Sequence, residues 1–338
     1  MGSRLDLSAI LASPEWLAHR YDAAQDMFHF RAVTRARHAS VPFLSDQHLG
    51  TADPLAIRRA EVEAALVDAP PTSIHFLFHS AYCASTMLVR LFDQPGRAMA
   101  LSEPQLLNDM TGWRRRGATV PEHAAVMGTA LHLLARPFPG ETATVVKPSN
   151  VFAALAPATL ALRPQARAVL LYAPLKDFLL SVARKQLWCR LWCRELLEGY
   201  LQDGFVQLGF EPRDFFRQSD LQVAAVGWLA QQAAFTRLVE RFGPRVATLD
   251  SVTLTRDPVA TATAAARHYG LAGLKFADHP ALGRDSKSGA NFGPGQRERD
   301  LAAAASAYGE EIAQVVGWAE AVADNAGVGL EGAAPLTV

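Results

Sequence analysis

Residues suited to acid–base and anion-binding chemistry stand directly after short apolar runs in this sequence. His79 and Ser80 follow IHFLF, Glu103 follows MALS, and Lys147 closes TATVVK. A carboxylate can take up a proton, and a lysine or histidine can hold a negatively charged group. A charged residue after a strand is common on protein surfaces, so each residue alone says little. Their recurrence at the ends of apolar runs indicates one shared site.

The stretch SIHFLFHSAYCASTMLVR, residues 73–90, has the layout of a phosphate-binding loop. Its apolar start predicts a strand, its end predicts a helix, and a turn of small and hydroxyl-bearing residues joins the two. Backbone N–H groups at the start of such a helix, together with the helix dipole, favour an anion. Ser80, Ser85 and Thr86 would add hydroxyl donors, although the loop has neither glycine nor lysine.

The same loop fits the ATP-binding pattern GxxxxGK[ST] poorly. With Thr86 as the last residue of that pattern, His79, Ala84 and Ser85 stand at its two glycine positions and its lysine position. Only the final hydroxyl survives, so a magnesium–ATP site would lack the lysine that neutralises the phosphate charge. A nucleotide-dependent kinase therefore stays open as an alternative, and so does a non-catalytic interaction protein whose loop has lost nucleotide binding.

Apolar runs alternate with helical patterns along most of the chain, and these elements must position the polar residues. Strands are expected at 74–78, 99–104, 142–149, 166–174 and 245–250, and helices at 86–92, 176–201, 221–242 and 257–270. Alternating strands and helices predict an α/β fold in three layers, with a central mostly parallel sheet flanked by helices. Ligands of such sheets bind at the carboxyl ends of the strands, which is where the polar residues fall.

The ends of the chain differ from this central pattern. Residues 1–70 are expected to form a helical accessory region, because PEWLAHRYDAAQDMFHFRAV and DPLAIRRAEVEAALVDA both show the spacing of amphipathic helices. Residues 71–326 carry the strand–helix pattern and are expected to form the α/β domain. The tail, residues 327–338, is expected to be frayed.

Composition argues against several classes of protein. The chain has 338 residues, half of them hydrophobic, which is enough to bury a large core. Basic and acidic residues are equal at 33 each, without the basic excess of a protein that coats nucleic acid. No run of 18 apolar residues and no leader-like start are seen, so neither a membrane span nor export is expected, and the cytoplasm is the expected location. Three cysteines predict buried thiols rather than a disulfide framework or a metal site.

The loop resembles the 5′-phosphosulfate loop of the sulfotransferase superfamily, whose members use 3′-phosphoadenosine 5′-phosphosulfate (PAPS) and need no metal. The family loop reads Pro-(Arg/Lys)-Ser-Gly-Thr-Thr-Leu, and its helix ends in Leu-Asp. AYCASTMLVRLFD keeps the Thr-(Leu/Met) pair and places Asp93 at the family's interval. Tyr82 is a departure, because it stands at the basic position. The chain looks most similar to bacterial members with a degenerate loop of this kind.

Three further stretches agree with the family in order and spacing. LSEPQLLND places Glu103 ten residues after the aspartate of the loop helix, the interval at which the tyrosylprotein branch has its general base. VLLYAPLKDFLLSVARK resembles the 3′-phosphate segment, with Lys176, Asp177 and Ser181 in register and Ala173 in place of an arginine. RVATLDSVTLTRDPVATATAAARHYGL resembles a strand, turn and helix near the family's end, and RDSKSGANFGPGQRERD its basic closing loop.

The resemblance covers about residues 70 to 300 and implies a P-loop NTPase-like α/β fold with sulfotransferase activity. It implies Glu103 as the general base, and Lys147 or His79 would supply the cation that the loop lacks. The implied nucleotide-binding residues are Ser80, Ala81, Tyr82, Cys83, Ala84, Ser85, Thr86, Ser181, Arg184, Arg284, Lys287 and Arg297. The partner would be a small-molecule hydroxyl or amine acceptor, whose identity the sequence leaves open, as it does the oligomeric state.

Overall fold

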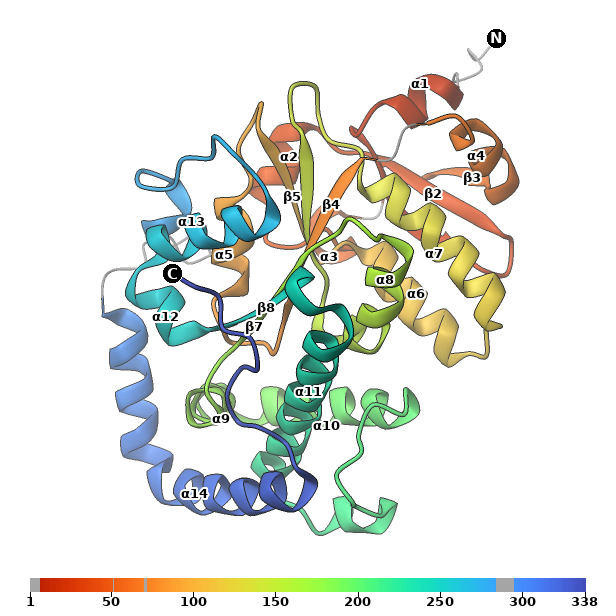
Figure 1. Cartoon of the computed structure of the whole chain (residues 1–338). Helices are drawn as coiled ribbons and strands as arrows, with labels where there is room; N and C mark the ends of the chain where they lie inside the picture. The colour runs from red at the N-terminus through yellow and green to blue at the C-terminus, as the bar shows by residue number, and fades with distance from the viewer. Residues whose placement is uncertain (1–6, 51, 70–71, 284–294) are drawn as a thin grey trace.

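A five-stranded parallel sheet organises the chain in the computed structural model, which describes residues 7–50, 52–69, 72–283 and 295–338. The strands follow the order β5-β6-β4-β7-β8 across the sheet (Figure 1). Their bounds are β4 (Ser73–His79), β5 (Ala98–Ser102), β6 (Ala143–Lys147), β7 (Ala168–Tyr172) and β8 (Val246–Asp250). Nearly every residue of these strands is buried, as expected for a parallel sheet covered on both faces.

Helices cover the sheet in two layers. On one side α5 (Ser85–Leu91) packs on β4, β5 and β6, and α13 (Pro258–Tyr269) packs on α5. The other layer holds α8 (Ala156–Leu162) and α11 (Asp220–Phe242), where α11 packs on β8 and on α8. Right-handed crossovers place helices in this way when successive strands are added in opposite directions. The predicted three-layer, P-loop NTPase-like α/β fold is confirmed.

The strand order reverses direction at β4. From β4 the chain runs through α5 to β5 at one edge, returns to β6, and then crosses to β7 and β8 on the other side of β4. A crevice opens at such a switch point, outside the carboxyl ends of the strands. The loop after β4 and the ends of β5 and β6 are therefore the segments best placed to bind a ligand.

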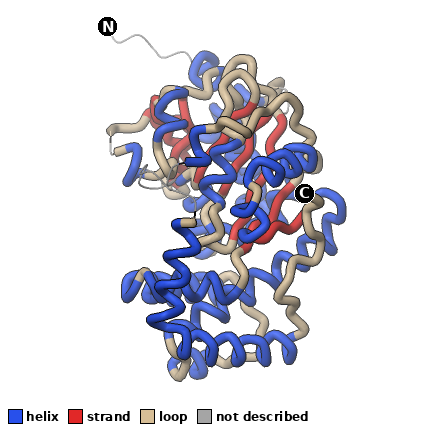
Figure 2. Tube along the Cα trace, turned by 90° about the vertical axis from the view of Figure 1, so that its left-hand side faces the viewer, coloured by secondary structure: helices blue, strands red, loops and turns tan. Residues whose placement is uncertain are grey.

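Several of the helices after β7 form the lower part of the molecule (Figures 1 and 2). Among them are α9 (Leu175–Arg184), α10 (Gln186–Gln202) and α14 (Gln296–Ala326), whereas α12 (Ser251–Arg256) and α13 lie in the upper part; α14 packs on α9 and α11. The single helix expected at 176–201 is wrong, because the chain turns between α9 and α10, where Gln186 adopts a φ of 59°. Within the described ranges no helix combines the length and the apolar character needed to cross a membrane.

The N-terminal region is not the helical unit expected from its sequence. It forms an antiparallel sheet of β1 (Trp16–Asp22), β2 (Met27–Ala32) and β3 (Leu55–Arg58). The turn between β1 and β2 is an Asx turn, in which Asp22 accepts hydrogen bonds from the N–H groups of Ala24 and Gln25. Only the second expected helix exists in part, as α4 (Arg59–Leu66). The hairpin forms in spite of the helical spacing of apolar residues, because side chains of both strands are buried against the rest of the protein.

The remaining elements connect these parts. They are α1 (Leu7–Ala12), α2 (Arg35–Ser40), α3 (Asp46–Leu49), α6 (Gln105–Arg115), α7 (Val120–Leu134) and α12 (Ser251–Arg256), with short 3₁₀ turns at Asn150–Leu155, Pro212–Phe216, Gly243–Arg245 and Pro280–Gly283.

The C-terminal tail is paired rather than frayed. Thr248 of β8 donates its N–H to Ala334 O at 2.7 Å, and Leu336 donates its N–H to Thr248 O at 2.7 Å. Gly332 N–H donates to the Tyr172 hydroxyl at 2.9 Å. The tail therefore lies along the outer edge of β8, and the expectation that it frays is wrong.

His75 on β4 is expected to make the fold sensitive to acid. Its Nδ1 accepts the Arg167 N–H at 3.2 Å, so its Nε2–H faces the Ser73 hydroxyl, and a second proton would displace the Arg167 bond. Burial, with Arg167 and His268 nearby, lowers the pKa of His75 to about 4. The unfolded chain therefore binds a proton first, and stability is lost as the pH falls from 6.5 to 4.

The measurement is urea unfolding at pH 7 and pH 4.5. We expect His75→Asn, which keeps an acceptor for Arg167, to reduce the acid-induced loss of unfolding free energy by about 2 kcal/mol. His29→Asn, on the partly exposed strand β2, is the control. An unchanged pH dependence in His75→Asn would show that His75 does not carry the effect.

Candidate active site

The loop after β4 keeps the backbone shape of a phosphate loop without glycine. Ala81, Tyr82 and Ala84 have left-handed φ values of 68°, 50° and 63°. Residues other than glycine pay about 1 to 2 kcal/mol for this conformation, and such strain gathers at functional sites. Backbone N–H groups in turns that contain left-handed residues can converge on one point, which is how anion-binding nests form. The loop leads directly into α5, where Ser85 and Thr86 are buried at the first turn.

Ala84 is the residue at the family's glycine position, and its strain can be tested. We expect Ala84→Gly to change the free energy of unfolding by less than about 1 kcal/mol, because relief of left-handed strain is offset by the greater freedom of glycine in the unfolded chain. Ala84→Val should cost about 2 kcal/mol or more, since a β-branched residue strongly disfavours this backbone. Chemical denaturation measures both, with Ala303→Val on the exposed face of α14 as the control. A harmless valine at 84 would contradict the left-handed assignment.

His79 and Ser80 hold the loop in place. His79 Nδ1 accepts the Ala81 N–H at 3.1 Å, so its Nε2–H donates to Pro148 O at 3.1 Å. Ser80 is 1% exposed, and its hydroxyl accepts the Ala173 N–H at 3.2 Å. Both side chains thus tie the loop to neighbouring strand ends. These contacts give both side chains a role in positioning the loop.

Tyr82 does not replace the missing basic residue. Its hydroxyl lies 2.9 Å from Cys189 Sγ on α10, and its ring packs against Phe178 and Trp192. Burial and the bond with Cys189 raise the pKa of the Tyr82 phenol far above its ordinary value. Cys83 is fully buried, and burial raises the pKa of its thiol. Neither residue offers a charge to a phosphate, so their contribution to binding is the loop backbone.

Glu103 and Lys147 form an ion pair at the ends of β5 and β6. Lys147 pairs in register with Ser102, and Glu103 donates its N–H to Lys147 O at 2.7 Å. The Lys147 ammonium donates to Glu103 Oε1, and His79 Nε2 lies 3.9 Å from the same oxygen. Lys147 is 0% exposed, whereas the Glu103 side chain keeps 23% of its surface. The three residues predicted to be catalytic therefore meet at one point.

Glu103 also has a strained backbone, with a φ of 48°. A left-handed residue directly after a strand turns its side chain away from the sheet, and such strain persists only where the surroundings fix it. The buried Lys147 ammonium holds the Glu103 carboxylate in place, and a carboxylate can accept a proton. The arrangement is suited to a general base.

Of the residues predicted to bind the nucleotide beyond the loop, Arg297 contacts the loop, whereas Arg184 and Ser181 bond to other residues. Arg297, in the first turn of α14, donates to Tyr82 O at 3.3 Å and to the Ser251 hydroxyl at 3.1 Å. Arg184 instead pairs with Asp300 of α14 at 2.9 Å. The Ser181 hydroxyl donates within its own helix, to Asp177 O at 2.8 Å. The predicted residues Arg284 and Lys287 lie outside the described residues.

The sequence missed some residues that complete this site. Phe43, from the N-terminal region, places its ring 5.2 Å from the Lys147 ammonium. Ser251 holds Arg297, and Asp300 holds Arg184. Phe43 stands in no recognisable motif, whereas Ser251 and Asp300 lie in family-like stretches without being singled out there; only the packing of distant segments brings the three residues here. Among the described residues, no group of three or more His, Cys, Asp or Glu side chains could hold a metal ion.

A cavity of about 840 Å³ lies elsewhere, beside the end of α5. Arg90, Asp93, Arg97, Lys275 and His279 are among its lining residues. None of the residues discussed at the carboxyl ends of β4, β5 and β6 lines it, so it is separate from the candidate active site.

No family model matches the chain, and no curated protein matches it. Several solved structures do match the chain. A sulfotransferase domain from the curacin biosynthetic pathway is 13% identical, with 65% of this chain and 81% of that chain covered and a TM-score of 0.42. A sulfotransferase from Alicyclobacillus acidocaldarius is 16% identical, with coverages of 75% and 96% and a TM-score of 0.38. The sulfotransferase domain of the Synechococcus PCC 7002 olefin synthase is 12% identical, with coverages of 72% and 96% and a TM-score of 0.39. All three structures are described as sulfotransferases or sulfotransferase domains.

Proposed function

We propose that the protein is a sulfotransferase that moves a sulfuryl group from PAPS to a hydroxyl or amine of a small acceptor, without a metal. The observation that carries this proposal is the meeting of Glu103, Lys147 and the strained loop at the point where the strand order reverses. A base, a buried cation and an anion-binding backbone are the parts that such a transfer needs. The order of the family-like motifs along the chain supports the same proposal.

In this mechanism the acceptor oxygen or nitrogen attacks sulfur in line, and the bond between sulfur and the 5′-phosphate oxygen breaks. The acceptor proton passes to the exposed part of the Glu103 carboxylate. Protonation neutralises the Glu103 carboxylate, so Glu103 no longer balances the positive charge of the Lys147 ammonium. That positive charge can then stabilise the negative charge that develops on the leaving phosphate. The loop backbone, with Arg297 close to it, would hold that phosphate.

Calorimetric titration tests the donor site. The purified protein would be titrated with 3′,5′-adenosine diphosphate, the spent donor, and separately with ADP and magnesium. We expect micromolar binding of the first and none of the second. Binding of ADP with magnesium alone would favour the kinase alternative, and binding of neither would favour a non-catalytic protein.

A further inference from the structure

The N-terminal region reaches the catalytic strand ends through the segment between α2 and α3. Leu44 donates its N–H to Ser102 O at 2.8 Å and accepts the Gln105 N–H at 3.0 Å. These two bonds lie on either side of Glu103 in the chain. The segment is therefore held beside the base, along the free edge of β5.

Phe43 stands next to this attachment and faces the ion pair. Its ring lies over the fully buried Lys147 ammonium, and the ring itself is only partly buried. The His48 ring meets Phe43 nearly edge-on, with 5.4 Å between centroids and 80° between planes, and His48 Nδ1 lies 3.0 Å from the Ser45 hydroxyl. Phe43 thus presents a partly exposed ring beside the lysine that pairs with Glu103, and His48 packs against that ring.

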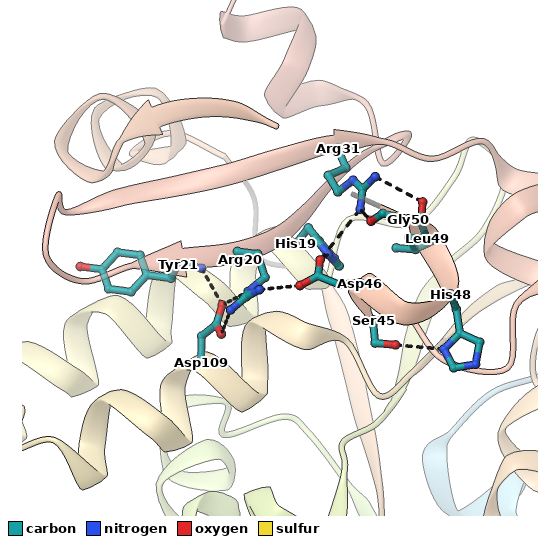
Figure 3. A network of polar contacts seen from close by, with 10 residues as sticks. All are labelled: His19, Arg20, Tyr21, Arg31, Ser45, Asp46, His48, Leu49, Gly50 and Asp109. Atoms are coloured by element: carbon teal, nitrogen blue, oxygen red, sulfur yellow. Dashed lines mark hydrogen bonds and ion pairs between the residues drawn. The ribbon is translucent and has the colours of Figure 1, made fainter. Parts of the chain in front are cut away.

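A network of ion pairs fixes this segment (Figure 3). Asp46 accepts a bond from His19 Nε2 at 2.6 Å and from Arg20 at 2.5 Å. Arg20 also binds Asp109 at 2.8 Å, on the helix α6 that follows Glu103. Arg31 donates to the carbonyl groups of Gly50 and Leu49 at the end of α3. The aromatic surface is therefore anchored to the same elements as the base, and such preorganisation suits a binding wall.

We propose that Phe43, with His48 behind it, is the acceptor wall of the site and selects an alcohol carried on an aromatic ring. This inference rests on the proposed function. The acceptor hydroxyl must come within hydrogen-bond reach of Glu103, so its carbon skeleton must pass the partly exposed Phe43 ring. Aromatic rings gain from edge-to-face and offset contacts beyond the burial of apolar area, which favours an aromatic skeleton over a saturated one.

The test uses PAPS with two matched primary alcohols, benzyl alcohol and cyclohexylmethanol, and measures release of 3′,5′-adenosine diphosphate. In each turnover a bond forms between the alcohol oxygen and sulfur, the bond from sulfur to the 5′-phosphate oxygen breaks, and the alcohol proton goes to Glu103. We expect kcat/KM to be about tenfold higher for benzyl alcohol. Phe43→Ala should lower that kcat/KM about tenfold or more, chiefly through KM, and remove the preference for the aromatic ring.

Phe43→Leu separates the ring from its apolar volume and guards against misfolding of the alanine variant. It should keep some affinity for both alcohols while losing the preference. Phe216→Ala, at a side chain that is 92% exposed, is the matched control and should leave the preference unchanged. Binding of 3′,5′-adenosine diphosphate should stay within about twofold in every variant, since the ring of Phe43 packs on Lys147 and His48, whereas the loop backbone is proposed to hold the donor phosphate.

Three outcomes would overturn the acceptor wall. They are equal use of both alcohols by the unaltered protein, a preference that survives in Phe43→Ala, and sulfation of neither alcohol while 3′,5′-adenosine diphosphate binds. Failure to bind 3′,5′-adenosine diphosphate at all is a different result. It would overturn the proposed function, and the acceptor assignment would fall with it.

Discussion

Glu103→Gln is expected to lower kcat for sulfuryl transfer by about 10² to 10⁴, while the Kd of 3′,5′-adenosine diphosphate changes by no more than about twofold. The amide keeps the shape of the side chain and still accepts a hydrogen bond from Lys147, but it cannot take the acceptor's proton. Single-turnover assays with PAPS, at a temperature where the variant is shown to be folded, measure the chemical step.

Glu141→Gln is the matched control for the loss of a buried carboxylate. Glu141 is 1% exposed and pairs with Arg35 at 2.9 Å, in the linker before β6. Its variant should be less stable yet retain kcat. If Glu103→Gln kept the full rate of transfer, Glu103 would not be the base.

The second large effect is a difference in stability between variants of the two partners of the Glu103–Lys147 pair. Glu103→Gln should lower the free energy of unfolding by about 3 kcal/mol, because it removes the carboxylate charge that pairs with the buried ammonium and leaves that ammonium charged. Lys147→Met should cost only about 1 kcal/mol, since it removes the buried charge itself and leaves a carboxylate that water can reach. The double variant Glu103→Gln/Lys147→Met should therefore be more stable than Glu103→Gln alone.

Urea unfolding of the two single variants and the double variant gives the three free energies. Together with the unaltered protein they form a double-mutant cycle. We expect the double variant to lose much less unfolding free energy than the sum of the two single losses. Equal costs for the two single variants, or an additive double variant, would show that Lys147 is hydrated or paired in another way.

The sheet could be predicted from the sequence because its strands are buried on both faces. Runs such as IHFLF and TATVV are continuous and apolar, and turn residues bound them, so each strand was placed to within a few residues. The candidate base and its lysine could be predicted for the same reason. In a parallel sheet the carboxyl ends of neighbouring strands meet at one edge, whatever lies between them in the chain.

The N-terminal region could not be predicted in this way. The turn between β1 and β2 reads DAAQD, without the glycine, asparagine or proline typical of hairpin turns, and helical spacing is the stronger signal in this stretch. The break at Gln186 gives no signal either, because glutamine is a good helix former and its left-handed backbone follows from the packing of α9 and α10. Tertiary contacts decided both features.

The clustering of Glu103, Lys147 and His79 could be predicted from the sequence, whereas the detailed contacts around them could not. His79 proved to be a loop anchor, and Tyr82 turned toward α10 and not toward the site. Phe43 could not be found from sequence at all, because its place above Lys147 depends on a hydrogen bond between segments nearly sixty residues apart.

Segments from the N-terminal and C-terminal parts of the chain pair with part of each outer strand of the sheet. Leu44 pairs with the free edge of β5, and residues 334–336 pair with the free edge of β8. An uncovered edge strand offers unpaired N–H and C=O groups to any other extended chain, and it is a frequent starting point for aggregation. The two end segments therefore keep a large apolar sheet in a form that does not recruit further strands.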